Sequence, residues 1–328
     1  MCSLLACTEP EAIKLQGSTM GTSYSVALPH LPKDISEQHI QSAIESLLVK
    51  VNQQMSTYLD DSELSQLNQS DASRWLSVSP ELFDLMLSAN SISKQSEGAF
   101  DVTVGPLVNL WGFGPAELPV RAMPSGEDIK KTRQLVGYHN LQINVKSRLL
   151  RKQFKDLYID LSAIAKGYGV DAVASYLDTL GIEDYLVEIG GELIAKGLSQ
   201  RSDYWRVAVE KPLPDQRMIQ RIINVTDFAV ATSGDYRNYF EKDGIRFSHT
   251  IDPRTGHPIS HSLASVTVLS EKAMLADAWA TALMVLGEEE GYKLAEKKQL
   301  AAYFLYRQDG GFISKETSAF TRLTKNSG

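Results

Sequence analysis

The chain has 328 residues, 43% of them hydrophobic and 22% charged, an ordinary globular composition that excludes bulk disorder and collagen-like or coiled-coil rods. At about 150 residues per domain, its length alone would suggest two domains. Its 33 basic and 40 acidic side chains give a net charge of −7 without a long basic run, which argues against nucleic acid as the main partner, and no segment reaches the roughly 18 apolar residues of a membrane span.

Both cysteines, Cys2 and Cys7, lie at the N-terminus. A cysteine-free body suits an oxidising compartment, and the segment from Leu4 to Cys7 resembles a bacterial lipobox. We read residues 1–6 as the end of a trimmed signal sequence and residues 8–13 as a tether, and the alternative is a chance apolar segment. On the first reading, lipid on Cys7 anchors the protein without spanning the membrane. We therefore expect it on the periplasmic side of a bacterial membrane, the inner one rather than the outer.

The first half of the chain predicts a strand followed by helices. Residues 14–28 alternate loosely up to Pro29 and predict one strand, and a capping box of Asp34 and Glu37 begins a helix whose apolar stripe reaches Met55. The remaining predictions are a helix begun by Ser79-Pro80-Glu81 and ending near Gly98, a Gly-rich and aromatic loop over residues 101–114, and a short helix opened by Ser125.

The second half mixes strands and helices without strict βαβ alternation. The predicted elements are strand-like pieces up to Ile159, a helix over 162–180, strands over 185–189, 205–209 and 221–231, a turn over 251–256, a helix over 274–286 stopped by Gly287, and a hairpin of 301–306 with 312–314. We therefore expect an α+β fold with largely antiparallel sheets and packed helices. No linker divides the chain, so residues 14–328 are predicted to form a single intertwined domain.

A possible phosphate site lies between Asp160 and Gly169. A strand ends there, an acid follows, and a glycine-containing helix begins, whose free N–H groups and positive dipole end suit a phosphate. Lys166 adds a positive charge. The alternative is a capped helix with a solvated lysine, because the run matches neither a Walker motif nor a dinucleotide fingerprint.

Two further motifs carry groups suited to catalysis. Asp277 and Thr281 are four residues apart on a predicted helix and share one face, and their oxygens are ligands that Mg²⁺ prefers; a surface aspartate beside a packed threonine is the alternative. His249 adjoins a turn and suits a general base, or simply a hydrogen bond to that turn. No metal spacing involves the histidines, so zinc is not expected.

Ambiguous alone, these motifs occur in a defined order. They are Thr19–Thr22, Met55–Tyr58, Gly98–Thr103, Trp111–Gly114, Asp160–Gly169, Gly190–Glu192, Ala231–Tyr236, His249–Gly256 and Asp277–Thr281. The series resembles the ApbE family of FAD:protein FMN transferases, many of which are periplasmic lipoproteins, over nearly the whole chain after Leu15. The resemblance implies an ApbE-like (T-fold-like) architecture.

The resemblance also implies an activity. Such enzymes split FAD at its pyrophosphate, require Mg²⁺, and place FMN through a phosphoester on a Thr or Ser of a target protein, such as a subunit of a quinone reductase, while AMP leaves. Carried over motif by motif, the residues that contact the flavin nucleotide are Met20, Tyr58, Ala99, Phe100, Asp101, Asp160, Lys166 and Ile251. The implied Mg²⁺ ligands are the backbone carbonyl of Ala163 with Asp277 and Thr281, and His249 is our candidate base.

Three other functions stay open on the sequence. The same metal site suits an FAD pyrophosphatase that passes FMN to water. A lipoprotein that binds FAD without chemistry is the second, although it has little use for a metal on the pyrophosphate. A periplasmic interaction module without a ligand is the third, and the glycine-rich motifs count against it.

Overall fold

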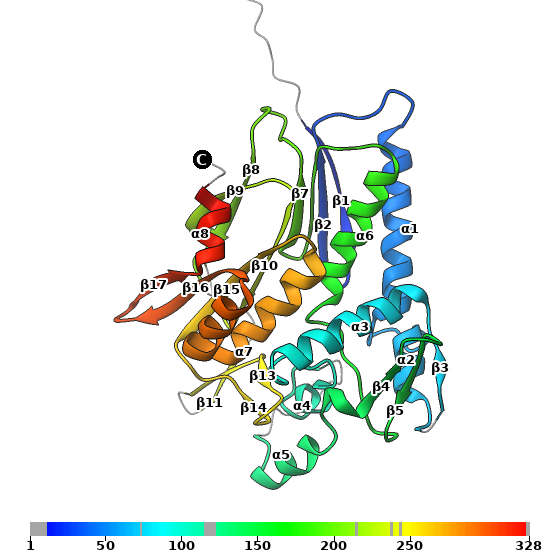
Figure 1. Cartoon of the computed structure of the whole chain (residues 1–328), viewed down its shortest axis with the longest axis vertical. Helices are drawn as coiled ribbons and strands as arrows, with labels where there is room; N and C mark the ends of the chain where they lie inside the picture. The colour runs from blue at the N-terminus through cyan, green and yellow to red at the C-terminus, as the bar shows by residue number, and fades with distance from the viewer. Residues whose placement is uncertain are drawn as a thin grey trace, which may run out of the picture.

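A computed structural model describes residues 12–72, 74–114, 123–213, 216–236, 239–242 and 245–325. At its centre is an eight-stranded sheet (Figure 1). Its strands, in spatial order, are β1 (Ile13–Thr19), β2 (Thr22–Leu28), β6 (Tyr185–Ile189), β7 (Glu192–Lys196), β10 (Phe228–Gly234), β15 (Leu263–Ser270), β16 (Ala301–Gln308) and β17 (Gly311–Glu316). All neighbouring pairs in this sheet run antiparallel, so the predicted α+β fold with antiparallel sheets is confirmed.

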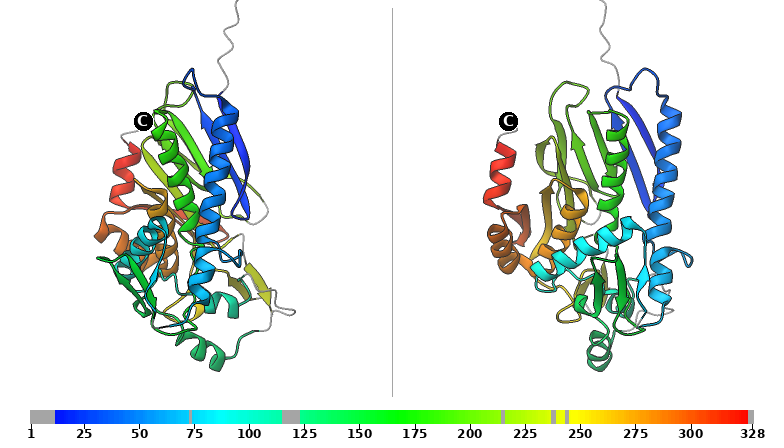
Figure 2. Two further views of the ribbon diagram at one scale, coloured as in Figure 1. Left: turned by 90° about the vertical axis from the view of Figure 1, so that its right-hand side faces the viewer. Right: turned by 45° about the vertical axis from the view of Figure 1, so that its right-hand side comes forward.

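Three long helices pack against this sheet. They are α1 (Glu37–Met55), α6 (Ala165–Thr179) and α7 (Ala273–Lys298). Figure 2 shows α1 and α6 side by side along the sheet, and their apolar residues form one core with β1, β2 and β6. Helix α7 packs on β10, β15 and β16 and also against α6. The two helices that carry the phosphate-site and metal-site motifs are therefore neighbours.

The remaining elements lie outside this sheet and its three long helices. A separate core joins the hairpin of β8 (Trp205–Glu210) and β9 (Ile219–Val225) and helix α8 (Ser318–Lys325) to β16. The other elements are α2 (Glu63–Gln69), α3 (Pro80–Gln95), α4 (Gly105–Leu110), α5 (Gly126–Arg133), a 3₁₀ turn (Tyr138–Asn140), a sheet of β3 (Leu76–Ser77), β5 (Leu149–Lys152) and β4 (Leu141–Asn144), and the hairpins β11 (Tyr239–Lys242) with β12 (Ile245–Ser248) and β13 (Ile251–Asp252) with β14 (His257–Pro258).

Several predicted elements differ in the structure. Residues 14–28 are a hairpin rather than one strand, because Met20 and Gly21 both take positive φ and reverse the chain. The N-cap of α1 is Ser36, whose hydroxyl accepts the His39 N–H, and not Asp34. The caps Ser79 of α3 and Ser125 of α5 are as predicted, the latter in a full capping box.

Three other predictions were wrong in detail. The loop predicted over 101–114 contains helix α4. The strand predicted over 221–231 is the end of β9 and the start of β10, separated by a turn in which Asp227 has a positive φ. Gly287 interrupts α7 with a non-helical φ of 77°, but helical structure resumes and continues to Lys298. A glycine therefore kinks this helix rather than ending it.

The proposed anchor segment, including Cys7, lies outside the described residues, and β1 begins at Ile13, one residue before the predicted domain boundary. Within the described ranges, none of the helices has the length and apolar character needed to cross a membrane.

Candidate functional site

A cavity of about 690 Å³ contains most of the predicted site residues. Its wall is built by the turn after α3, the start of α6, the start of β7, the end of β10, β13 and one face of α7. The predicted residues that line it are Tyr58, Ala99, Phe100, Asp101, Asp160, Ala163, Lys166, His249, Ile251, Asp277 and Thr281. The tertiary structure thus gathers motifs that are up to 223 residues apart (58 to 281) around one space.

A lysine between two buried carboxylates forms the charged part of the cavity. Lys166 Nζ lies 3.4 Å from Glu192 Oε2 and 3.8 Å from Asp277 Oδ2. Burial raises the pKa of Asp277 and raises that of Glu192 to about 8, although Lys166 opposes both shifts. Burial opposes the charge of Lys166 as well, but Asp277 and Glu192 outweigh it and raise the lysine pKa. Lys166 is therefore a cation that keeps its charge at neutral pH and is held in place by two ion pairs.

Three groups with oxygen donors line the same cavity. Asp277 and Thr281 lie one turn apart on α7, and Ala163 precedes α6. Oδ2 of Asp277 accepts the Gly167 N–H at 3.1 Å, which fixes the carboxylate at the start of α6. Within the described ranges no cluster of three or more His, Cys, Asp or Glu side chains is placed to hold a metal. A carbonyl, a hydroxyl and one buried carboxylate instead suit a hard cation that shares its coordination sphere with phosphates and water.

The predicted acid Asp101 also shapes the backbone around the cavity. Its Oδ1 accepts the Thr103 N–H and hydroxyl, and its Oδ2 accepts the Tyr138 N–H at 2.7 Å. Burial raises the pKa of Asp101 despite these bonds. The Asp160 N–H donates to the Val102 carbonyl at 2.7 Å. This joins the turn after α3 to the segment leading into α6, so both predicted acids are held in one wall.

Two of the predicted flavin-binding residues, Tyr58 and Met20, do not lie in the interior of the cavity. Tyr58 lines the cavity but is 70% exposed, which places it at the rim, where its ring is available to a ligand. Met20 is not among the residues that line the cavity. It occupies the β1–β2 turn, and its Cε would lie 2.9 Å from a Cβ built on Gly169. Met20 therefore packs beside α6 behind the cavity wall.

His249 lies in an aromatic part of the cavity. Its ring meets the edge of Phe113 with the centroids 6.3 Å apart, and Phe113 in turn lies against Phe240 at 5.5 Å. Tyr236 and Tyr239 also line this part. An imidazole facing the same space as Lys166 and Asp277 is placed to take a proton from a group bound there.

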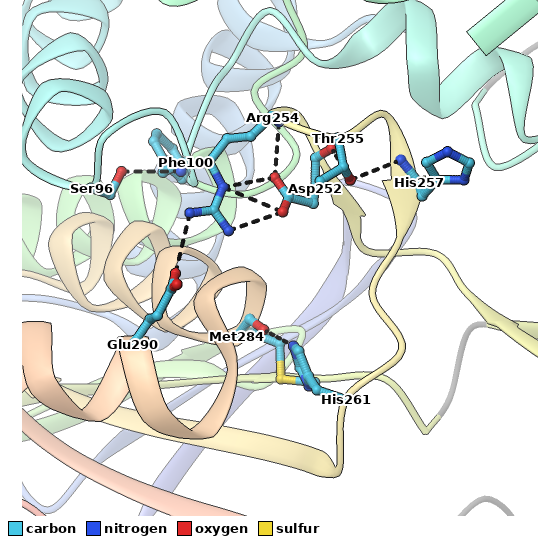
Figure 3. A network of polar contacts seen from close by, with 9 residues as sticks. All are labelled: Ser96, Phe100, Asp252, Arg254, Thr255, His257, His261, Met284 and Glu290. Carbon is cyan, nitrogen blue, oxygen red and sulfur yellow. Dashed lines mark hydrogen bonds and ion pairs between the residues drawn. The ribbon is translucent and has the colours of Figure 1, made fainter. Parts of the chain in front are cut away.

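The segment after His249 is held by a network of polar contacts (Figure 3). The Arg254 guanidinium donates to both carboxylate oxygens of Asp252 at 3.0–3.3 Å and reaches Glu290 of α7 at 3.5 Å. The Trp111 indole N–H donates to the Gly256 carbonyl at 2.9 Å. These bonds fix the β13–β14 turn, which presents Ile251 and Pro253 to the cavity.

Sequence reasoning gave no role to Glu192, although the Gly190–Glu192 motif was noted. The structure buries it beside Lys166, and within the described ranges its Oε2 is contacted by the Lys166 ion pair without a well-formed hydrogen bond. In the sequence, Glu192 directly follows Gly190 and Gly191, which form a turn with positive φ. An acid at such a turn was the feature that could have indicated a role for Glu192. Thr232 and Ser233 line the cavity as well, and they lie within the noted Ala231–Tyr236 motif.

Comparison with known proteins agrees with this arrangement. The model of the ApbE family matches residues 20–304. The FAD:protein FMN transferase of Vibrio cholerae serotype O1 is 48% identical over 318 residues, which is 97% of this chain and 94% of that protein. The solved flavin transferase ApbE from Vibrio cholerae superposes with a TM-score of 0.88 at 46% identity, covering 95% of this chain and 99% of that one. The apo flavinyl transferase ApbE of Pseudomonas stutzeri gives 0.87 at 40% identity, with 96% and 97% covered. The chain therefore belongs to the ApbE family.

Proposed function

We propose that this chain is an FAD:protein FMN transferase, the activity named for its Vibrio cholerae relative. The observation that carries the proposal is the fixed cation Lys166 beside two buried carboxylates in a cavity with an aromatic side. The cavity volume of about 690 Å³ falls in the range of roughly 300–1,000 Å³ typical of small-molecule sites. Such a site suits a ligand with a flat ring at one end and a pyrophosphate at the other.

In the proposed reaction, the hydroxyl oxygen of an acceptor Thr or Ser attacks the FMN phosphorus of FAD. A new O–P bond forms, the pyrophosphate P–O bond breaks, and AMP leaves with the bridging oxygen. Lys166 offsets the negative charge of the pyrophosphate, which otherwise repels the nucleophile. His249 accepts the hydroxyl proton.

Mg²⁺ is the proposed cofactor, held by the carbonyl of Ala163 and the side chains of Asp277 and Thr281. When bound, it supplies charge neutralisation and polarises the phosphoryl group. Support comes from the three residues with oxygen donors that line the same cavity and from the burial of Asp277. The flavin nucleotide is held by Ala99, Phe100, Asp101, Asp160 and Ile251 in the wall and Tyr58 at the rim. Met20, which packs beside α6, supports the wall and does not touch the nucleotide.

One assay tests the function. The protein is mixed with FAD, Mg²⁺ and an acceptor domain with an exposed Thr, and intact protein masses and released nucleotides are recorded. We expect an acceptor heavier by one FMN group, with AMP released and both products blocked by EDTA. FMN and AMP without an adduct, obtained across several acceptor domains, would identify a pyrophosphatase instead, and intact FAD retained on the protein would identify a carrier.

We also propose that lipid on Cys7 anchors the protein to the periplasmic face of the membrane, where the acceptor is a membrane redox subunit. The support is the lipobox-like segment ending at Cys7. In cells fed a labelled fatty acid, we expect label on the wild-type protein and none on the Cys7→Ser variant. Equal labelling of the two proteins contradicts the anchor.

A further inference from the structure

Helix α7, which carries Asp277 and Thr281, receives its N-terminal cap from another helix. Its own N-cap residue, Lys272, makes no side-chain cap bond. The first two helical N–H groups instead donate to the carboxylate of Asp171 on α6, from Ala273 to Oδ1 at 2.7 Å and from Met274 to Oδ2 at 3.0 Å. A carboxylate at a helix N-terminus also interacts favourably with the helix dipole.

A second contact lies one turn earlier on the same face of α6. Residues 167 and 171 are four apart, so they point to the same neighbour. The Gly167 N–H donates to Asp277 Oδ2 at 3.1 Å. A Cβ built on Gly167 would lie 2.4 Å from the Ala273 carbonyl oxygen, which shows how closely the two backbones approach.

We propose that Asp171 is a positioning residue that sets the placement of α7 on α6, and with it the distance from Asp277 to Lys166 and Ala163. The two carboxylate oxygens hold two consecutive backbone N–H groups, so they fix both the height and the rotation of the first turn of α7. Asp277 follows one turn later and points back at the start of α6. The inference rests on the proposed function in taking Ala163, Asp277 and Thr281 as the residues that hold Mg²⁺.

Two substitutions grade this contact. Asp171→Asn keeps one accepting oxygen and places an amide N–H₂ against the other backbone N–H, whereas Asp171→Ala removes both acceptors. Asp178 on the same helix offers a matched control, because its carboxylate accepts hydrogen bonds from Tyr185 and Lys196 and not from the first turn of α7. Asp178→Asn therefore perturbs α6 without touching the α6–α7 junction.

The test measures the Mg²⁺ concentration for half-maximal FMN transfer, the apparent FAD affinity, and the hydrogen exchange of the residue 273 and 274 amides. Partners that orient metal ligands typically change metal affinity by about 10–100-fold. We expect the half-saturating Mg²⁺ concentration to rise about tenfold in Asp171→Asn and about 100-fold in Asp171→Ala, with a much smaller change in FAD affinity. The amides of residues 273 and 274 should exchange faster in Asp171→Asn than in the wild type, and faster still in Asp171→Ala. Asp178→Asn should match the wild type in all three measurements.

Unchanged Mg²⁺ dependence in both Asp171 variants overturns the inference, as does an equal shift in Asp178→Asn, which would reveal a general loss of stability. If Asp171→Ala fails to fold, Asp171→Asn alone decides between these outcomes. If the wild type transfers no FMN, the proposed function fails separately, and Mg²⁺-dependent thermal stabilisation of the FAD-loaded protein together with amide exchange still tests the role of Asp171.

Discussion

At the scale of single residues, the most informative feature is the ion-pair cluster of Lys166 with Glu192 and Asp277. Two buried carboxylates next to one cation leave an excess of negative charge when all three are ionised. Burial accordingly raises the pKa of Glu192 to about 8, although Lys166 lowers it. Burial thus disfavours the charge on both carboxylates while Lys166 keeps its own, so the lysine remains available to a bound phosphate.

His249 carries the first residue-level prediction. Replacing His249 by Ala should slow FMN transfer by about 10²–10⁴-fold, the usual contribution of a general base, and leave FAD affinity nearly intact. Transfer rates and FAD binding are measured on the same preparations. His257→Ala is the control, because that exposed ring lies beside Trp111 at 6.0 Å and outside the cavity wall. Collapse of FAD binding in His249→Ala would make His249 a binding residue.

Asp277 carries the second prediction. Asp277→Ala removes the only carboxylate among the proposed Mg²⁺ ligands, so Mg²⁺-dependent transfer should be abolished at any Mg²⁺ concentration tested. Glu271→Ala, an exposed acid just before α7, is the matched control and should transfer FMN at the wild-type rate. Full activity of Asp277→Ala would eliminate the proposed metal site.

At the scale of elements, the α6–α7 junction decides whether the site exists. The phosphate-site motif belongs to α6 and the oxygen pair to α7, and neither helix forms a site alone. Gly167 permits their close approach, and Asp171 fastens the end of one helix to the side of the other. Backbone contacts of this kind leave little room for adjustment, because protein interiors are packed at crystal-like density.

Gly167→Ala should separate the two helices. The added methyl meets the Ala273 carbonyl, a backbone atom that cannot move aside, and overpacking of this kind costs about 1–3 kcal/mol of unfolding free energy. We expect lower stability in denaturant and weaker Mg²⁺-dependent transfer. Gly126→Ala is the control, because a Cβ there meets nothing within 4 Å in the described part of the chain. Wild-type stability of Gly167→Ala would show that the junction tolerates a wider spacing.

Asp171 should also leave a signature in the pH dependence of stability. Burial raises its pKa to about 6 in the folded protein, above the unfolded value of about 3.9. The folded state therefore binds the Asp171 proton more tightly than the unfolded state does. The contribution of this proton to the free energy of unfolding is fully present below about pH 4 and is lost as the pH rises through about 6. Ionising Asp171 therefore lowers the free energy of unfolding at the pH values where both of its oxygens are charged acceptors for α7. Functional sites commonly cost stability in this way.

Asp171→Asn lacks this titration. The difference in unfolding free energy, wild type minus variant, should fall between pH 4 and pH 7, as measured by denaturant titration at each pH. Other buried acids, such as Asp101 and Glu192, are present in both proteins and largely cancel. Parallel curves for the two proteins would mean that Asp171 titrates near its ordinary value.

At the scale of the whole molecule, the cavity is assembled from the central sheet, the long helices and the β13–β14 hairpin together. The proposed anchor segment precedes all of these elements. Residues that contribute to the core begin with Ile13 and Leu15, and the predicted site begins with Met20.

A chain that starts at residue 12 should therefore fold and transfer FMN to a dissolved acceptor at the rate of the full chain. Transfer rate and melting temperature are compared for the two proteins. A chain that starts at residue 20 serves as a control and should be insoluble, because loss of β1 uncovers the buried β2 residues Tyr24 and Val26. A tenfold slower reaction in the first truncation would place part of the catalytic apparatus before residue 12.

Local signals explain which elements could be predicted. Serine caps marked the starts of α3 and α5, and a proline at the first turn also marked α3, because these signals depend on side chains only a few residues apart. The failures share a different cause. The hairpin reversal at Met20 and Gly21 and the kink at Gly287 depend on positive φ angles, which the apolar periodicity of the chain does not encode.

The sequence by itself determined the α+β class, the order of motifs and the resemblance to the ApbE family, because these follow from local pattern and from residues at fixed spacings. The candidate flavin and Mg²⁺ residues were implied by that resemblance, motif by motif. Only the tertiary structure decided that Lys166 lies between Glu192 and Asp277, that Met20 sits behind the wall, and that Asp171 caps α7. Burial and contacts between residues about 100 positions apart, as between Asp171 and Ala273, arise from the packing of α6 on α7, which no local pattern in the chain encodes.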